Sequence, residues 1–257
     1  MIIGINGYAG SGKDTVGTII QYLTSDAYKE GRSYEKYLER STNPVAFGMI
    51  YQHTWEIKKW AGKLKEIASI LTNIPINKFE DQDFKKTELS SEWDIIEETM
   101  PCGCDRFMDW YHKDGKCANC DEPTQITRTP MTIRELLQRL GTDAMRVGLH
   151  TNTWVNALMS EYVMNKEHFN DIANGREVGD GYPKWIITDT RFPNEAQAIK
   201  DKGGILIRVN RKGVNPINNH PSEVGIDNWD FDHIIDNNGS INELIESVKL
   251  ILNNYGK

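Results

Sequence analysis

The first fifteen residues constrain the fold of this chain more than any other stretch. Residues 1–5 form an apolar run with the length and β-branched content of a short buried strand. A glycine-rich turn occupies residues 7–12, and apolar side chains then recur at helical spacing over residues 15–23. A strand, a glycine-rich turn and a helix in this order are typical of α/β proteins that bind an anion at the turn.

The turn has the Gly-x-x-x-x-Gly-Lys spacing of a phosphate-binding P-loop, in the strand–helix context that the motif requires. Its glycines allow backbone N–H groups to curl round a phosphate, while the helix N-terminus and Lys13 add positive charge. The alternative is a glycine-rich hairpin with a chance lysine, which leaves the flanking strand and helix unexplained. We expect the cofactor phosphates to be bound by Gly10, Ser11, Gly12, Lys13 and Thr15.

The residue after Lys13 departs from the common form of this motif. It is Asp14, and the hydroxyl residue Thr15 comes one position later. This variant is similar to the loop of nucleoside monophosphate kinases, rather than to that of GTPases or motor ATPases. Asp14 either caps the helix or holds a metal ion or an acceptor. Thr15, Asp14 and Asp189 all remain candidates for positioning Mg²⁺.

The composition of the chain excludes several classes of protein. Its 257 residues carry a net charge of −7, whereas proteins that coat nucleic acids carry basic patches. No apolar run is long enough to cross a membrane, and a hydrophobic content of 39% suffices for one large domain. The first strand begins at the N-terminus, so we expect no signal peptide and a cytoplasmic location. The negative charge does not argue against nucleotides as partners, because they need only a local positive pocket. We therefore predict no membrane partner and no stable nucleic-acid partner.

Strand and helix patterns alternate along the rest of the chain, which predicts a P-loop three-layer α/β fold with a mainly parallel sheet. Ligands of such sheets bind at the carboxyl ends of the strands, so the glycine-rich loop and Asp189 can share one site. The expected strands are 184–189, 205–209 and 231–236, and the expected helices are 61–71, 194–202 and 240–252.

An acid, a base and a second acid follow the strand predicted at 184–189. Asp189 is suited to hold Mg²⁺ through water or to orient a substrate group. Arg191 is suited to bidentate contact with a phosphate, and Glu195 to fix Arg191 or to accept a hydrogen bond from a sugar or base. For such a segment alone, a helix-capping turn with a salt bridge is an equal explanation. Its position opposite a P-loop favours function.

A helix is predicted from Thr132, which forms a capping box with Glu135. Arg134 and Gln138 lie four residues apart on one face, and we expect this pair to point into the site. Arg139 and Arg146 are further cations of this helix. Trp154, in the next helical segment, is either a base-stacking platform or a core residue. The expected buried stripe consists of Ile133, Leu136, Leu137, Leu140, Ala144 and Val147.

Residues 100–124 interrupt the α/β pattern and contain all four cysteines. The spacing is Cys-x-Cys, twelve residues, then Cys-x-x-Cys, which can close a tetrahedral structural Zn²⁺ site. A metal would allow an insertion with few apolar residues to fold. The alternative is four unliganded thiols in a loop. The predicted zinc ligands are Cys102, Cys104, Cys117 and Cys120.

Five separate segments together resemble the deoxynucleoside monophosphate kinases of bacteriophages of the T4 and T5 type, in order and in rough spacing across most of the chain. The resemblance implies ATP-dependent phosphorylation of deoxynucleoside monophosphates with Mg²⁺, on an adenylate-kinase-like fold. It implies nucleotide substrates, a single kinase domain over 1–257, and a host-cytoplasmic location if the protein is phage-encoded. The cysteine segment departs from this family, and its spacing predicts a four-cysteine zinc knuckle inserted at 100–124. The five segments are 7–15, 61–66, 134–154, 189–195 and 220–223.

Roles for particular residues follow from the same resemblance. The catalytic residues it implies are Lys13, Asp14, Arg134, Asp189 and Arg191. The acceptor-site and substrate-binding residues it implies are Gln138, Asp143, Trp154 and Glu195, with Arg134 also facing the acceptor. His220 and Glu223 are candidates for a mobile or acceptor-side loop. The resemblance also moves the second strand to residues 58–60.

Two alternatives stay open at this point. One is another small-metabolite P-loop kinase, such as one acting on dephospho-coenzyme A, whose C-terminal pattern this chain loosely shares. The other is a zinc-containing P-loop protein that binds nucleic acid or regulates a partner, which the negative charge disfavours. The accepted base is not determined. A homodimer is also open, because aromatic residues of 25–51 are expected at the surface, as an interface or a lid.

Overall fold

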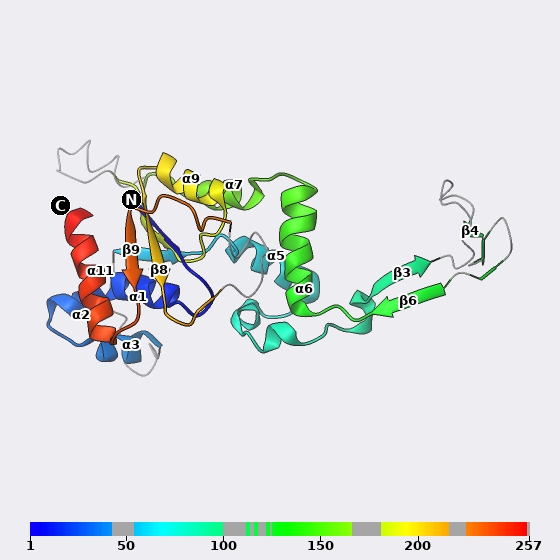
Figure 1. Cartoon of the computed structure of the whole chain (residues 1–257), viewed down its shortest axis with the longest axis horizontal. Coiled ribbons are helices and arrows are strands. Elements are labelled where there is room, and N and C mark those ends of the chain that lie inside the picture. The colour runs from blue at the N-terminus through cyan, green and yellow to red at the C-terminus, as the bar shows by residue number, and fades with distance from the viewer. Residues whose placement is uncertain are drawn as a thin grey trace. The chain divides into compact units, whose positions relative to one another are not determined.

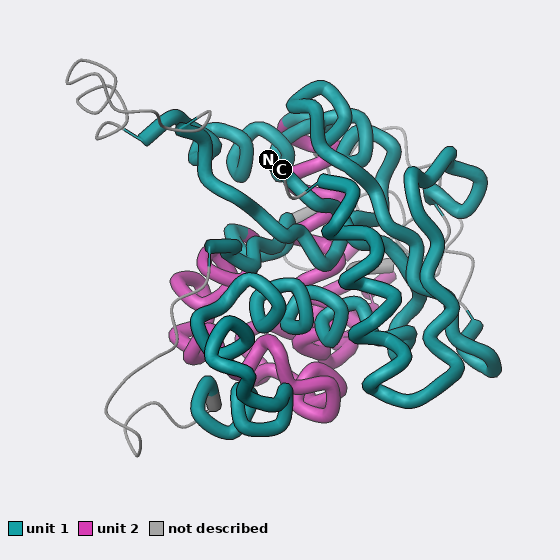
Figure 2. Tube along the Cα trace, turned by 90° about the vertical axis from the view of Figure 1, so that its left-hand side faces the viewer, with its two compact units in different colours: residues 1–63, 150–257 teal, residues 64–149 magenta. Residues whose placement is uncertain are grey.

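The computed structural model describes residues 1–42, 54–99, 112–113, 116–117, 122–123, 125–165, 181–215 and 225–255. The chain forms two compact units, residues 1–63 with 150–257 and residues 64–149 (Figure 2). The prediction of a single kinase domain with an inserted knuckle stays a prediction. Within the described ranges, no helix is long and apolar enough to cross a membrane.

The first unit is built on a five-stranded sheet with the order β2-β7-β1-β8-β9 (Figure 1). Every neighbouring pair is parallel, with Ile3 opposite Ile186 on one side and opposite Ile205 on the other. This confirms the predicted α/β fold with a mainly parallel sheet. The strands are β1 (Ile2–Asn6), β2 (Trp55–Lys58), β7 (Lys184–Ile187), β8 (Ile205–Asn210) and β9 (His233–Asp236).

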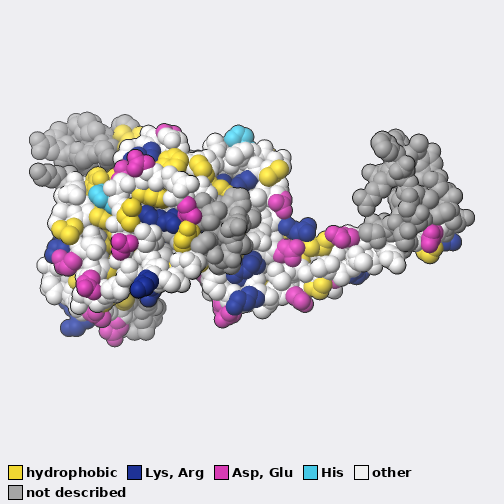
Figure 3. Space-filling model, viewed as in Figure 1, with side chains coloured by type: hydrophobic (Ala, Val, Ile, Leu, Met, Phe, Trp, Pro, Cys, Tyr) yellow, Lys and Arg dark blue, Asp and Glu magenta, His cyan; other side chains and the backbone are white. Residues whose placement is uncertain are grey.

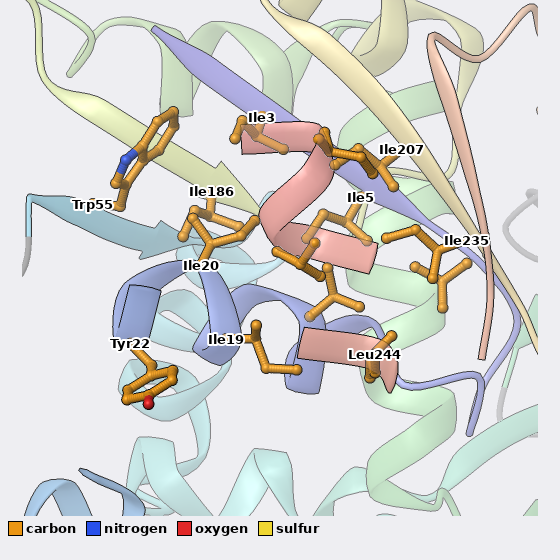
Figure 4. Close-up of a cluster of buried hydrophobic side chains, with 14 of the residues drawn as sticks. Ile3, Ile5, Ile19, Ile20, Tyr22, Trp55, Ile186, Ile207, Ile235 and Leu244 are labelled. Atoms are coloured by element: carbon orange, nitrogen blue, oxygen red, sulfur yellow. The ribbon is translucent and has the colours of Figure 1, made fainter. Parts of the chain in front are cut away.

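Helices cover both faces of this sheet, as parallel strands with apolar side chains on both faces require. On one face, α1 (Lys13–Leu23) and α11 (Ile241–Tyr255) pack over β1 and its neighbours (Figure 4). On the other face lie α7 (Thr153–Met159) and α9 (Pro193–Asp201). Successive β1 residues serve the two layers, since Ile2 belongs to the second core and Ile3 to the first.

The tyrosines of the segment after α1 are less exposed than the sequence suggested. Two helices, α2 (Asp26–Lys29) and α3 (Tyr34–Thr42), pack against α1. Tyr34 is 5% exposed and Tyr37 is 2% exposed, because both rings pack against Tyr22. The expected exposed aromatic surface is therefore wrong for these two residues.

The second unit has a small core of its own, centred on Ala68, Phe79 and Ile133. It also contains an antiparallel strand pair, β3 with β6, that the sequence patterns did not predict. Two very short strands, β4 (His112–Lys113) and β5 (Lys116–Cys117), pair as well. The remaining elements are α5 (Gly62–Thr72), η1 (Ile76–Glu80), η2 (Phe84–Lys86), η3 (Ser91–Trp93), β3 (Ile95–Thr99), β6 (Gln125–Thr129), α6 (Ile133–Gln138) and the π-helix η4 (Arg139–Val147).

Two further expectations need correction. The second strand is Trp55–Lys58 rather than 58–60, because the N–H groups of Trp60 and Ala61 bond to the Asp189 carboxylate instead of a neighbouring strand. The stripe after Thr132 ends early, since Ala144 is exposed and Val147 is 79% exposed. The wider π-helical turn of η4 does not keep the 3.6-residue spacing on which that stripe was predicted.

Candidate phosphate-binding site

The glycine-rich loop joins β1 to α1 and is clamped by the segment after β9. The amide Nδ2 of Asn237 donates a hydrogen bond to the Ser11 carbonyl oxygen at 2.8 Å. Gly12 has a φ of 101°, in the left-handed region, and a Cβ there would collide with the Asn237 amide. Glycine is therefore required at position 12 for both conformation and space.

Several features of this loop fit an anion. The eleven-residue helix α1 starts at Lys13, so its first N–H groups have no intrahelical acceptors. Ser11 is 1% exposed, and its hydroxyl has no hydrogen-bond partner among the residues that the structure describes. Such an unsatisfied buried hydroxyl is uncommon, and a phosphate oxygen would satisfy it. The Lys13 ammonium group donates to the Tyr8 carbonyl oxygen at 2.8 Å, so it lies within the loop.

The Asp14 carboxylate is held by side chains from two other elements. Its Oδ1 accepts a hydrogen bond from the Thr188 hydroxyl at 2.7 Å, at the carboxyl end of β7. The Lys59 ammonium group, just after β2, lies 3.6 Å from the same oxygen. The Asp14 side chain nevertheless remains 73% exposed. The carboxylate is therefore fixed at the edge of the sheet where strands β1, β2 and β7 end, and it remains accessible to a ligand.

Asp189 bonds to backbone rather than to the loop. Its two carboxylate oxygens accept the N–H groups of Trp60 at 2.9 Å and of Ala61 at 3.1 Å. These bonds join the end of β7 to the segment between β2 and α5. They give Asp189 a structural role, and its proposed metal contact stays a prediction.

Glu195 accepts hydrogen bonds from backbone N–H groups at the start of α9. It is 1% exposed, and its Oε2 accepts the N–H groups of Arg191 at 2.8 Å and of Phe192 at 3.1 Å. Of the two roles expected for Glu195, fixing Arg191 is seen at the Arg191 backbone, while contact with a sugar or base stays a prediction. Arg191 is half-buried, between β7 and the first turn of α9.

The predicted acceptor residues divide between the two units. Arg134 is exposed on α6 of the second unit and donates to Gln82 Oε1 at 3.3 Å. Gln138 and Asp143 are also exposed in that unit. Trp154 lies in the first unit, in α7, and is 4% exposed, as the core alternative expects. Their role in an acceptor site stays a prediction.

The expected acceptor-side loop and most of the expected zinc ligands lie outside the residues that the structure describes. His220, Glu223, Cys102, Cys104 and Cys120 fall outside the described residues. Cys117 lies in β5, where only the backbone is described. The described residues, which omit most of the cysteine segment, contain no cluster of three metal-ligating side chains. The zinc site therefore stays a prediction.

A cluster that the sequence did not reveal braces the start of the loop. The Arg208 guanidinium lies 4.6 Å from the centre of the Tyr8 ring and bonds to Asn6 and, at 2.9 Å, to Asp227. The Tyr8 hydroxyl donates to Asp227 at 2.7 Å, and this bond raises the pKa of Tyr8. Thr188 and Asn237 directly follow β7 and β9, and this position is the one signal that could have pointed to them. Arg208 lies within β8 and carries no such signal.

The topology places the loop where a ligand is expected. Strands β7 and β2 lie on one side of β1, and β8 and β9 lie on the other. The loop thus begins at the carboxyl end of the strand beside which the direction of winding changes, the usual ligand position in open α/β sheets. The fold and the loop together are those of the P-loop class of α/β proteins.

Comparison with known proteins narrows this class. The chain belongs to the deoxynucleotide monophosphate kinase family, whose family model matches residues 1–248, and this confirms the predicted resemblance.

Individual relatives agree with this family. The chain is 31% identical over 118 residues to the deoxynucleotide monophosphate kinase of Enterobacteria phage T4, a match covering 46% of this chain and 44% of that protein. It is 31% identical over 125 residues to a putative deoxynucleotide monophosphate kinase of Acanthamoeba polyphaga mimivirus, covering 46% and 59%. It is 24% identical over 245 residues to the deoxynucleoside-5'-monophosphate kinase of Escherichia phage T5, covering 88% and 85%. The first two matches span about half of the relatives' length.

Proposed function

We propose that the protein transfers the terminal phosphoryl group of ATP to a deoxynucleoside monophosphate, giving the diphosphate. The observation that carries this proposal is the loop between β1 and α1, with its unsatisfied buried Ser11 hydroxyl, its Lys13 ammonium and the Asp14 carboxylate fixed beside it. Family membership supplies the substrate class. The proposed fold is the adenylate-kinase-like form of the three-layer architecture.

The loop residues are assigned to the donor. Phosphoryl transfer depends mainly on positioning and on positive charge around the moving group. Backbone N–H groups of Gly10, Ser11 and Gly12, with the Lys13 ammonium, would bind the ATP phosphates. Arg191 would neutralise charge that develops on the transferred group, from a loop whose backbone Glu195 holds in place.

Oxygen ligands for Mg²⁺ are present at the same edge of the sheet. Mg²⁺ prefers carboxylate, hydroxyl and water oxygens, and when bound it would neutralise the donor phosphates. Asp14 is exposed and Thr15 follows it, whereas both Asp189 oxygens already accept backbone N–H groups. We therefore assign the metal to Asp14 and Thr15 ahead of Asp189.

The acceptor is assigned to Arg134, Gln138, Asp143 and Trp154, with Glu195 as a further candidate. A guanidinium group suits a monophosphate, and an indole ring suits a base. Because Trp154 is buried, its contribution would be to shape the site.

The four cysteines are assigned to a structural Zn²⁺ site. This rests on their spacing alone, in which Cys102-x-Cys104 and Cys117-x-x-Cys120 supply four thiolates. Metal analysis of the purified protein should find one zinc per chain. A chelator should lower the melting temperature before it affects turnover. An unchanged melting temperature would contradict the site.

The decisive experiment is a substrate screen with Mg-ATP and each of the four common deoxynucleoside monophosphates, in which formation of the diphosphate and of ADP is measured. Dephospho-coenzyme A is included as the competing acceptor. Turnover of at least one deoxynucleoside monophosphate supports the proposal, and turnover of dephospho-coenzyme A alone favours the other kinase. No turnover together with tight DNA binding would favour a nucleic-acid-binding protein.

The surface charge argues against a nucleic-acid-binding protein. On the face shown in Figure 3, acidic and basic side chains are interspersed.

A further inference from the structure

The Asp14 carboxylate has an orientation that its own helix does not impose. Asp14 lies in the first turn of α1, and its side chain is 73% exposed. An exposed aspartate on a helix ordinarily samples more than one rotamer, because nothing offsets the entropy of fixing it. Here one carboxylate oxygen contacts Thr188 and Lys59, from segments that lie far from it in the sequence.

Thr188 is set up to donate that hydrogen bond. It is 1% exposed, and a Cβ placed on Gly17 of α1 would come within 2.8 Å of its Cγ2 atom. The Thr188 methyl group therefore packs against α1, where the neighbouring residue has no side chain. Because a β-branched side chain has few χ1 choices, packing the methyl group also fixes the hydroxyl, which points to Asp14.

Lys59 is brought to Asp14 by the backbone around it. The next two residues, Trp60 and Ala61, are tied through their N–H groups to the Asp189 carboxylate. Asp189 follows Thr188 directly, so the end of β7 supports Asp14 both directly and through the segment that carries Lys59. The Lys59 side chain is 30% exposed.

We propose that Thr188 and Lys59 are positioning residues for Asp14, which they hold in one orientation beside the phosphate-binding loop. The inference rests on the proposed function for its kinetic consequence only. An ion pair as exposed as this one contributes little to stability. Losing these contacts should therefore lower kcat and leave the melting temperature nearly unchanged.

The test compares three hydroxyl variants. Thr188→Val keeps both branches of the side chain and the packing against Gly17, and removes the donor. Thr188→Ser keeps the donor. Thr18→Val is the matched control, since the Thr18 hydroxyl also bonds to Asp14, but at the backbone carbonyl oxygen, at 3.0 Å.

We expect Thr188→Val to lower kcat about 10- to 100-fold, the range for a misplaced catalytic group, with KM for ATP changed less than about threefold. Thr188→Ser and Thr18→Val should each stay within about threefold of the original kcat. Lys59→Met should lower kcat and Lys59→Arg should restore most of it. In the Asp14→Asn background, Thr188→Val should have little further effect, as expected for groups that act through one another. A normal kcat for Thr188→Val, or an equal loss in both backgrounds, would overturn the inference.

A second readout needs no turnover. Three-bond scalar couplings in isotopically labelled protein report the χ1 rotamer of Asp14. One rotamer should dominate in the unmodified protein and in Thr18→Val, and averaged couplings should appear in Thr188→Val and Lys59→Met. Averaged couplings in the unmodified protein would overturn the inference. Failure of the substrate screen with a single Asp14 rotamer would instead overturn the proposed activity and leave the positioning role intact.

Discussion

The helices α9 and α1 start at the same edge of the sheet, and the acidic residues in their first turns have opposite hydrogen-bonding roles. At the start of α9, Glu195 is buried and turns back to accept the N–H groups of Arg191 and Phe192. At the start of α1, Asp14 is exposed and is held by side chains of other elements. Glu195 therefore caps the helix to which it belongs, whereas Asp14 leaves the N-terminus of its helix without a side-chain cap. The start of α9 is therefore capped by its own side chain, whereas the first N–H groups of α1 are available to the phosphate that we propose.

The largest expected effect is at the open helix start. Lys13→Met removes the only full positive charge of the glycine-rich loop itself, and we expect turnover to fall about a thousandfold or more. A coupled assay of ADP formation measures this. Lys36→Met, an exposed lysine on α3, is the control and should be active. A Lys13→Met enzyme with a near-normal rate would remove the basis for calling this helix start a phosphate site.

The next largest effect tests whether the start of α9, which Glu195 caps, also takes part in phosphoryl transfer. Arg191→Ala should lower kcat about 100- to 1,000-fold, because a cation facing the developing charge is lost. Since Glu195 bonds to the backbone N–H of Arg191, the α9 cap should survive and the melting temperature should change little. Steady-state kinetics beside a melting curve separate the two. An unchanged kcat would contradict a role of Arg191 in phosphoryl transfer and would leave the start of α9 with a structural role alone.

A stability measurement compares the two acids directly. Glu195→Ala should lower the free energy of unfolding by about 1–3 kcal/mol, because two part-buried N–H groups lose the Glu195 carboxylate as acceptor. Asp14→Ala should cost less than about 0.5 kcal/mol, as is usual for exposed positions. Urea unfolding of both variants provides the numbers. Equal losses would show that Asp14 is also a structural cap.

The smallest expected effect concerns the cluster of Tyr8, Arg208 and Asp227 at the start of the glycine-rich loop. Tyr8→Phe removes the hydrogen bond to Asp227 and should lower the free energy of unfolding by about 0.5–1.5 kcal/mol. Because that bond raises the pKa of Tyr8, its contribution is fully present below the ordinary tyrosine pKa of about 10 and is lost as pH rises through the raised value. Unfolding of both proteins at pH 8 and above pH 10 checks this. A difference that persists undiminished at high pH would be inconsistent with the bond.

The sequence predicted the elements better than the contacts between them. The strand and helix at the P-loop follow from local patterns, as do the cap at Thr132 and the helix α11 with Ser240 before it. Local patterns did not predict the burial of Tyr34, because its partner Tyr22 lies on another helix. The β3–β6 pair joins segments separated by the cysteine-rich stretch, so neither strand reveals its partner.

The same limit applies to the site. Asp14, Asp189, Arg191 and Glu195 are recognisable because each belongs to a motif of neighbouring residues. Lys59 and Thr188 carry no such signal, since their contacts with Asp14 depend on how three strand ends meet. Side chains that orient others are thus harder to find from sequence than side chains that touch a ligand.

The central position of β1 has a consequence for how the protein is made. Its sheet partners are β7 and β8, so β1 waits during synthesis for residues 184–187 before it can pair. At ordinary translation rates of 5–20 residues per second, that delay is roughly 10 to 40 s, during which an apolar strand emerges without its neighbours. The loop is clamped later still, when Asn237 reaches Ser11. Nucleotide binding by chains arrested at successive lengths would therefore report the completion of folding.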